Sequence, residues 1–375
     1  MQIGFYAPLK SPDDPIPSGD RTIAMLMVDA LTHGGHSPRI MSTLRALDIS
    51  GDPLRQENIR RQAEKEIDRI LKRFEAAQSE PIDLWFTYHL FHKAPDWIGP
   101  KVCARLGIPY VVAEASYAPR QKNGPWDMGL QQVGQALAGA SGVISLNPRD
   151  IPCIQPLISE NVAQLSLRPF AHDSPPRNLS KQDCKDKLAK ECGLDADVPW
   201  LLSVAMMRPG DKQRSYEVLA QSLELLPNQE WRLIVIGDGE VKTNIQQRFR
   251  PVSDRVFFAG SLEPERVHAF LDASDLFVWP AINEAFGMAL LEAQRHGVAV
   301  VAGRTDGVAT VVEQGVTGTL VNPGDAASFA EAVAGFLNAP ARCQRFGASA
   351  RKKFLALHNF HSASQQIDAF IRSLI

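Results

Sequence analysis

The feature that most constrains the fold of this 375-residue chain is an alternation of short apolar runs with helical patterns. Over the first 170 residues or so the apolar runs read IGFYAP, SPRIMS, IDLWFTY, PYVVAEA and GVISLN, with helical segments between them. Short apolar strands that alternate with helices are typical of a parallel sheet covered on both faces. The sequence therefore predicts an α/β architecture.

The long helical segment between the second and third apolar runs illustrates the pattern. Its apolar residues recur at spacings of three and four, while arginine and glutamate fill most other positions. These apolar residues are Ile59, Ala63, Ile67, Ile70, Leu71 and Phe74. The segment is expected to be a helix with one buried stripe.

A second alternating series follows a proline-rich stretch from His172 to Ser180, whose composition suits a linker. Its apolar runs read PWLLSVAMM, WRLIVIGDG, DRVFFAG, DLFVWP, VAVVAG and GTLVNPG. We expect two Rossmann-like domains, residues 1–172 and 181–358, with parallel sheets that face a central cleft. Ligands of such sheets bind beyond the carboxyl ends of the strands, so functional residues should follow strands.

Composition removes several classes of function. The 40 lysines and arginines nearly balance the 42 aspartates and glutamates, which argues against a nucleic-acid binder. The 5 cysteines have no spacing typical of a metal site. The pair Asp195 and Asp197 precedes its strand, whereas a catalytic pair should follow one. No metal and no other cofactor is expected.

Membrane insertion is not expected either. The chain has no basic segment followed by a long apolar core at its N-terminus, and no apolar stretch approaches ~20 residues. The segment 52–78 is rich in arginine and lysine, but acidic residues lie among them, so a solvated face is favoured over a membrane-binding one. A cytoplasmic location is expected, with membrane-surface association as the weaker alternative.

Polar residues follow strands of the first half. Gly19 lies in SGDRT, between the first strand and its helix, where a helix N-terminus offers N–H groups to an anion. His89, His92 and Lys93 follow the strand IDLWF, and Glu114 closes the strand PYVVAEA. Each of these residues also has a purely structural interpretation as a turn glycine, a hydrogen-bonded histidine at the sheet rim or a paired carboxylate.

The second half carries cations after its first strand. Arg208 and Lys212 flank a Pro-Gly turn in RPGDK. Such cations suit a diphosphate, although a solvated basic turn is the alternative. The segment GDGEVK starts like a dinucleotide fingerprint but has Lys242 at the third glycine position, so no NAD site is expected.

The segment NEAFGMALLEAQ, Asn283 to Gln294, raises the main functional question. Glu284 should lie in a loop and Glu292 within a helix that begins at Phe286–Met288. The two glutamates would be at most roughly 12 Å apart if all intervening residues were helical, and the helix start between them suits a diphosphate. The alternative is an ordinary helix start with a surface glutamate.

These motifs together resemble the retaining glycosyltransferases of family 4, which have the GT-B fold. The resemblance is densest from Leu201 to Ala330 and includes the Glu-x7-Glu signature as EAFGMALLE, the basic segment RPGDK, the turn GDG and the strand VFFAG. The first half matches more loosely, through SGDR. The C-terminal helix, about residues 360–375, resembles the helix that returns to the first domain in this fold.

The resemblance implies roles for individual residues. Glu284 would bind the donor sugar, Glu292 the ribose, and the amides of Phe286, Gly287 and Met288 the sugar or diphosphate, with Gly19 also on the donor side. Arg208 and Lys212 would neutralise the leaving diphosphate in place of a metal ion.

Two departures from the family pattern concern the basic segment and the first domain. The family's arginine usually lies closer to the strand, where this chain has Met206 and Met207. The family's first-domain histidine is also absent after PYVVAEA. Either His89 or Glu114 would take over its contact, and His92 and Lys93 are further candidates for the acceptor or sugar.

The predicted function is transfer of a sugar, with retention, from a UDP- or GDP-sugar to a sugar, lipid or small-molecule acceptor of unknown identity. Two other functions fit the same motifs. A nucleotide-sugar epimerase would use the same double-Rossmann scaffold without an acceptor, and a non-catalytic protein would only bind the nucleotide sugar.

Overall fold

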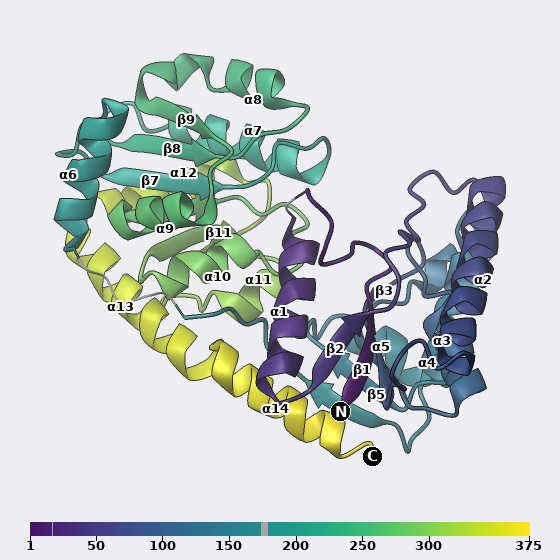
Figure 1. Ribbon diagram of the computed structural model, residues 1–375. Coiled ribbons are helices and arrows are strands. Elements are labelled where there is room, and N and C mark those ends of the chain that lie inside the picture. Colours follow the sequence, from purple (N-terminus) through teal and green to yellow (C-terminus); the bar gives the residue numbers. More distant parts are fainter. Residues whose placement is uncertain (17, 174–178) are drawn as a thin grey trace. The chain divides into compact units, whose positions relative to one another are not determined.

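The computed structural model describes residues 1–16, 18–173 and 179–375, which divide into two compact units (Figure 1). Unit 1 comprises Met1–Arg168 and Phe360–Ile375, and unit 2 comprises Pro169–Asn359. The predicted linker from His172 to Ser180 lies in part outside the described residues. The described part holds no helix that is long and apolar enough to cross a membrane.

Unit 1 is built on a six-stranded parallel sheet with the order β2-β1-β3-β4-β5-β6. The strands are β1 (Gln2–Tyr6), β2 (Ser37–Ile40), β3 (Leu84–Leu90), β4 (Tyr110–Ala115), β5 (Gly142–Ser145) and β6 (Ala163–Ser166). Strand β1 pairs with β2 on one side and with β3 on the other, so the direction of strand addition reverses between β1 and β3. A ligand site is expected at the carboxyl ends of the strands at such a switch point.

Helices cover both faces of this sheet (Figure 1). They are α1 (Gly19–His33), α2 (Pro53–Glu75), α3 (Gly99–Leu106), α4 (Asp127–Ala138), α5 (Ile151–Ile154) and α14 (Phe360–Arg372), with 3-10 turns η1 (Pro119–Gln121) and η2 (Gln155–Leu157). Helix α1 packs against the C-terminal α14, whereas α2 packs against α3 and α4 on the opposite face. The predicted stripe of α2 is buried at Ile59, Ala63, Ile67 and Ile70.

Unit 2 is built on a second six-stranded parallel sheet, with the order β12-β11-β10-β7-β8-β9. The strands are β7 (Trp200–Val204), β8 (Arg232–Ile236), β9 (Val256–Gly260), β10 (Leu276–Trp279), β11 (Ala299–Gly303) and β12 (Gly318–Val321). The strands are apolar on both faces and largely buried, as parallel strands beneath helices should be. Here the switch point lies between β7 and β10.

The helices of unit 2 follow the strands in sequence. They are α6 (Lys181–Cys192), α7 (Asp211–Glu224), α8 (Lys242–Arg248), α9 (Pro264–Ala273), α10 (Met288–Arg295), α11 (Asp306–Val311), α12 (Ala326–Leu337) and α13 (Pro340–Leu357), with the 3-10 segment η3 (Arg250–Arg255). Helix α6 packs on α9, α7 on α12, and α10 on α13.

The predicted α/β class with two parallel sheets is confirmed. Helix α10 begins at Met288, the last of the three residues over which its start was predicted. Gly287 precedes it in the left-handed conformation, with a φ of 70°, so the regular helix cannot extend back through this residue.

Candidate functional site

The topology of unit 2 brings its two predicted motifs together. Strands β7 and β10 pair directly through Leu276 and Leu201, although about 75 residues separate them in the sequence. The loop that carries Arg208 and the loop that carries Glu284 therefore leave neighbouring strands at the same edge of the sheet. This edge is the switch point of the sheet.

Lys212 and Glu284 form the central contact of this edge. The Lys212 Nζ atom forms an ion pair with Glu284 Oε2. The same carboxylate oxygen accepts a hydrogen bond of 3.1 Å from Trp279 Nε1, and the ammonium lies 5.3 Å from the centre of the Trp279 ring. The side chains of Lys212 and Glu284 are 35% and 17% exposed, so both remain within reach of a ligand.

The loop between β10 and α10 is held at several points. Asn283 Nδ2 donates to Asp211 Oδ2 at 2.9 Å, and Thr305 Oγ1 donates to the carbonyl of Glu284 at 2.8 Å. Ala281 and Asn283 both have a φ of 52°, in the left-handed region that residues other than glycine rarely adopt. Strained backbone of this kind persists only where surrounding contacts impose it, and it concentrates at ligand sites.

Two glycines allow neighbouring segments to approach this loop. A Cβ atom on Gly303 would lie 1.9 Å from the carbonyl oxygen of Pro280. A Cβ atom on Gly307 would lie 1.3 Å from the carbonyl oxygen of Ala285. Because neither distance is sterically possible, only glycine at both positions permits the observed course of the loop.

The predicted amide donors lie at the start of α10. Gly287 is the N-cap residue and Met288 is the first helical residue, so the N–H groups of this turn have no partner within the helix. The side chain of Phe286 is buried, with 6% exposure, and anchors the turn in the core. The turn can therefore present backbone donors and a partial positive charge to an anion.

Glu292 lies in the second turn of α10 and is half-buried. Burial raises the pKa of its carboxyl group, and the nearby Arg295 guanidinium acts in the opposite direction. Arg208 lies on the loop before α7, and its exposed side chain makes no hydrogen bond or ion pair with the residues described. The structure thus places Glu284 and Lys212 in contact but leaves Arg208 outside this contact.

In unit 1 the predicted His89 is paired with Asp20. His89 Nδ1 lies 2.9 Å from Asp20 Oδ1, which joins the end of β3 to the first turn of α1. Burial alone would lower the pKa of His89, but the hydrogen bond and charge of Asp20 raise it, with further contributions from Glu114 and Asp150. This pair lies at the switch point between β1 and β3. Gly19 is the first residue of α1, and a Cβ atom there would meet nothing within 4 Å.

Glu114 lies beside His89 on the adjacent strand. Strands β3 and β4 pair at Tyr88 with Ala113 and at Leu90 with Ala115, so the two residues occupy equivalent positions. Both have positive φ, 62° for His89 and 60° for Glu114. The Glu114 carboxylate is 9% exposed and accepts a hydrogen bond of 3.1 Å from the amide of Leu146.

The charge state of Glu114 is set mainly by burial. Burial raises the pKa of its carboxyl group to about 7. The charge of Asp150 also raises this pKa, whereas the charge of His89 lowers it. Burial also raises the pKa of the Asp150 carboxyl group. The end of this sheet therefore holds three carboxyl groups, those of Asp20, Glu114 and Asp150, around a single histidine.

Among the described residues, His92 and Lys93 make no hydrogen bond or ion pair with this cluster, and both side chains pack on Trp126. The ring centroids of His92 and Trp126 are 6.0 Å apart, and Lys93 Nζ lies 4.4 Å from the centre of the Trp126 ring. Burial lowers the pKa of His92, with a contribution from Lys93. The backbone carbonyl of Lys93 accepts a hydrogen bond of 2.8 Å from the amide of Asp48.

Several residues at these edges were not predicted from the sequence. Asp20 lies inside the motif SGDRT, and its place in the first helical turn next to Gly19 was a usable signal. Trp279, Thr305 and Asp150 carried no such signal, because only the folded chain brings them to the predicted residues. Within the described part of the chain, no group of three or more histidine, cysteine, aspartate or glutamate residues could hold a metal ion.

Known sequences are similar to part of this chain, and the family match lies within unit 2. The family described as glycosyl transferases group 1 matches residues 185–353. D-inositol 3-phosphate glycosyltransferase 2 of Catenulispora acidiphila is 37% identical over 123 residues, which are 33% of this chain and 29% of that protein. A D-inositol 3-phosphate glycosyltransferase of Xylanimonas cellulosilytica is 28% identical over 200 residues, 52% of this chain and 47% of that protein. The chain therefore spans less than half the length of either relative in these matches.

Solved structures match the whole chain. Sucrose-phosphate synthase of Thermosynechococcus elongatus superposes with a TM-score of 0.75 at 19% identity and covers 100% of this chain and 98% of that one. Anabaena Alr3699/HepE in complex with UDP and glucose superposes with a TM-score of 0.73 at 16% identity and covers 99% of each chain. At this identity the likeness establishes the fold.

Proposed function

We propose that this chain, whose residues 185–353 belong to the group 1 glycosyl transferases and whose fold is GT-B, transfers a sugar from a nucleoside diphosphate to an acceptor with retention of configuration. The observation that carries the proposal is the contact of Lys212 with Glu284 beside the start of α10. A cation, a carboxylate and a helix N-terminus at one switch point match the diphosphate and hydroxyl groups of a nucleotide sugar.

Each group of unit 2 has a task in this reaction. Lys212 and the amides of Phe286, Gly287 and Met288 stabilise the charge that develops on the departing diphosphate. Glu284 exchanges its contact with Lys212 for the hydroxyl groups of the donor sugar. Arg208, exposed in the structure, turns toward the diphosphate when the donor binds.

Glu292 binds the ribose of the donor. Its place in the second turn of α10 puts a half-buried carboxyl group on the helix that begins at the diphosphate site. The ribose hydroxyl groups donate hydrogen bonds to the carboxylate and compensate its burial. Since the ribose changes little during the reaction, this contact supplies binding and not catalysis.

The reaction proceeds without a metal ion. The acceptor oxygen attacks the anomeric carbon on the face from which the diphosphate leaves, and the acceptor proton passes to the departing phosphate oxygen. Retention follows because the new bond forms on the side of the broken one. Lys212, Arg208 and the helix amides supply the positive charge that a divalent cation supplies in other transferases.

The acceptor binds to unit 1 through its hydroxyl groups. The cluster of Asp20, His89, Glu114 and Asp150 offers carboxylate acceptors and one imidazole, which suit a polyhydroxylated molecule. The Catenulispora and Xylanimonas relatives are named for D-inositol 3-phosphate, and the Anabaena neighbour was solved with UDP and glucose. These names support a UDP-sugar as donor and a hydroxyl-rich acceptor.

Ligand-dependent stability tests the donor. Thermal unfolding is measured with UDP, GDP and ADP and with their glucose derivatives. A ligand at 100 times its dissociation constant stabilises the protein by about 2.7 kcal/mol, and only the cognate nucleotide should do so. No stabilisation by any of these nucleotides would contradict the proposal.

Turnover experiments separate transfer from the two other candidate functions. Transfer gives a product whose anomeric configuration, measured by NMR coupling constants, matches that of the donor. The rate should be unchanged by EDTA. An epimerase would isomerise the nucleotide sugar without an acceptor, and a non-catalytic protein would bind the nucleotide with neither hydrolysis nor transfer.

A further inference from the structure

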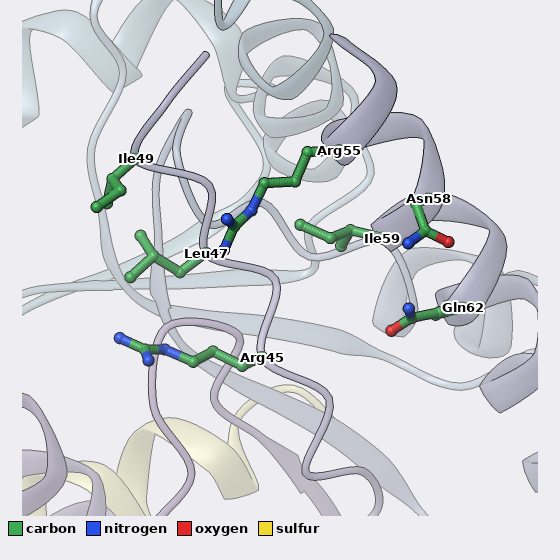
Figure 2. Close-up of a pocket in the computed structure, with 7 residues that line it drawn as sticks. All are labelled: Arg45, Leu47, Ile49, Arg55, Asn58, Ile59 and Gln62. Atoms are coloured by element: carbon green, nitrogen blue, oxygen red, sulfur yellow. The ribbon is translucent and has the colours of Figure 1, made fainter. Parts of the chain in front are cut away.

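Unit 1 contains a pocket that the contacts described above do not use. It lies between the loop after β2 and the first turns of α2, has a volume of about 530 Å³, and is drawn in Figure 2. Its lining residues are Arg45, Leu47, Ile49, Arg55, Asn58, Ile59 and Gln62. The volume falls within the roughly 300–1,000 Å³ that is typical of small-molecule sites.

Arg45 is held at the pocket by the backbone around it. The hydroxyl group of Tyr6 donates to the carbonyl of Leu44 at 2.7 Å, and the amide of Ala46 donates to the carbonyl of Pro8 at 2.8 Å. Arg45 Nε donates to the carbonyl of Leu9 at 3.3 Å. These bonds fasten the loop to the segment after β1 and fix the stem of the arginine, while its two terminal amino groups make no hydrogen bond or ion pair with the described residues. The charge of Arg45 contributes to lowering the pKa of Asp14, a carboxylate that is paired with Lys10 at 3.4 Å.

Arg55 lies beside the buried Asp48, whose carboxylate accepts its hydrogen bonds from other donors. Asp48 is 1% exposed and accepts hydrogen bonds from the amides of Ser50 and Gly51, at 3.0 and 2.9 Å, and from Gln56 Nε2 at 3.1 Å. Arg55 Nε forms an ion pair with the same carboxylate at 3.6 Å, which is beyond ordinary hydrogen-bond distance. The Arg55 side chain remains 57% exposed and available to a ligand.

The charge at the pocket differs from the charge along the rest of α2. On the helix surface Arg60 and Arg61 both pair with Glu57, and Arg69 pairs with Glu66. The seven lining residues of the pocket include two arginines and no acidic side chain, and the one ion pair described for these arginines is that of Arg55 with Asp48 at 3.6 Å. Asn58 and Gln62 on α2 add amide donors, so the lining offers donors to an anion from both the loop and the helix.

The other lining residues are apolar. They are Leu47 and Ile49 on the loop and Ile59 on α2, and the side chain of Ile49 is 70% exposed. Figure 2 shows Arg45 and Arg55 from different elements, with Leu47 and Ile49 beside them. A ligand that fits this mixed lining carries an anionic group and a short carbon skeleton.

The pocket lies at the edge of the sheet that also holds the His89 cluster. The loop that lines it follows β2, and this loop is joined to the loop after β3 by the hydrogen bond from Asp48 to Lys93. All strands of the sheet are parallel, so these loops leave it at the same end. The carboxyl groups near His89 would repel an anion, whereas the arginines of the pocket attract one.

We propose that this pocket binds the anionic group, a phosphate or a carboxylate, of the acceptor, through Arg45 and Arg55. The identification of the ligand as the acceptor rests on the proposed transferase function, but the binding of an anion to unit 1 does not depend on that function. Arg55 takes the anion through its planar fork, with Arg45, Asn58 and Gln62 as further donors. The acceptor then contributes hydroxyl groups to the opposite, carboxylate-rich part of the edge.

Direct binding without any nucleotide sugar tests the site. The probe is sn-glycerol 3-phosphate, with glycerol as the uncharged match, and calorimetry on the full chain gives dissociation constants. Arg45→Gln and Arg55→Gln should each weaken binding of the phosphate probe at least about 10-fold, and the double variant should weaken it more. Arg45→Lys and Arg55→Lys should keep part of the affinity because they retain the positive charge. The matched control is Arg61→Gln on the same helix, which should leave binding unchanged.

Anionic vesicles identify the source of the anion. If phosphatidylglycerol vesicles bind the wild type but not the double variant, and soluble glycerol 3-phosphate does not bind, the group is a lipid headgroup. If the soluble probe binds, the acceptor is a free anion. Equal binding of probe and vesicles to wild type and double variant, or no binding of either, overturns the proposal.

A parallel measurement of UDP binding distinguishes failure of this proposal from failure of the proposed function. UDP affinity depends on unit 2 and should be the same in all variants. Loss of anion binding with intact UDP binding supports the pocket. A wild type that binds the phosphate probe but no nucleotide would retain the pocket and refute the transferase. Circular dichroism and melting temperatures verify that each variant is folded.

Discussion

Replacement of Glu284 by glutamine tests the contact on which the proposed function rests. The amide oxygen can still accept the hydrogen bond from Trp279 Nε1, which is 3.1 Å long in the wild type. The substitution removes the charge that faces Lys212 and the charge that would stabilise the developing positive charge of the donor sugar. If that stabilisation is about 2.7 kcal/mol in the transition state, kcat falls on the order of 10²-fold.

Unfolding cannot account for a loss of this size. The side chains of Glu284 and Lys212 are 17% and 35% exposed, and an ion pair that is partly exposed contributes about 1 kcal/mol or less. A protein with a free energy of unfolding of roughly 5–15 kcal/mol stays folded after such a change. The kinetic effect therefore reports on the reaction.

The assay is the initial rate of sugar transfer at varied donor concentration, together with thermal melting monitored by circular dichroism. Glu224→Gln, at the exposed C-terminal end of α7, is the matched control and should leave kcat unchanged. Lys212→Met completes a double-mutant cycle. Because the two residues act on one transition state, their combined loss should be smaller than the product of the single losses. A kcat for Glu284→Gln within about 3-fold of the wild type, in a folded protein, would refute the assignment.

Three further predictions follow from other positions. Glu292→Ala should raise the donor KM about 10-fold with little change in kcat, because the ribose is bound similarly in the ground and transition states; a fall in kcat alone, measured by initial rates, would contradict this. Gly307→Ala should weaken UDP binding at least about 10-fold by calorimetry, because its Cβ atom would collide with the Ala285 carbonyl, whereas Gly134→Ala, whose Cβ atom would lie 3.8 Å from its nearest neighbour, should not. The folded pKa of Glu114, about 7, lies above its usual value, so folding favours the protonated form, and stability falls as pH rises from about 4.5 to 7. Glu114→Gln should remove up to about 3 kcal/mol of this fall in the free energy of unfolding, measured by urea unfolding at pH 5 and 8. Parallel pH profiles of stability for wild type and variant would refute the assignment of the fall to Glu114.

The sequence alone determined the architecture and the position of the unit 2 motifs. The period of its apolar residues fixes which segments are strands and which are helices, since each segment must bury one face or stripe. Two alternating series then imply two parallel sheets, and both were found. Glu284 and Lys212 were predicted as ligand-binding residues because ligand groups follow strands in such sheets.

Only the tertiary structure decided which of these residues meet. The contact of Lys212 with Glu284 spans 72 residues, and that of His89 with Asp20 spans 69 residues. Both depend on the order of strands in the sheets, which places β10 beside β7 and β3 beside β1 and is not encoded in any local pattern.

The dependence on long-range contacts also explains which features could not be predicted from the sequence. Three features come from long-range packing: the left-handed backbone of His89 and Glu114, the approach of Gly307 to Ala285, and the placement of Arg45 and Arg55 at one pocket. A residue's propensities describe its own segment, whereas the strain that it tolerates and the partners that it acquires are set by elements distant in the chain.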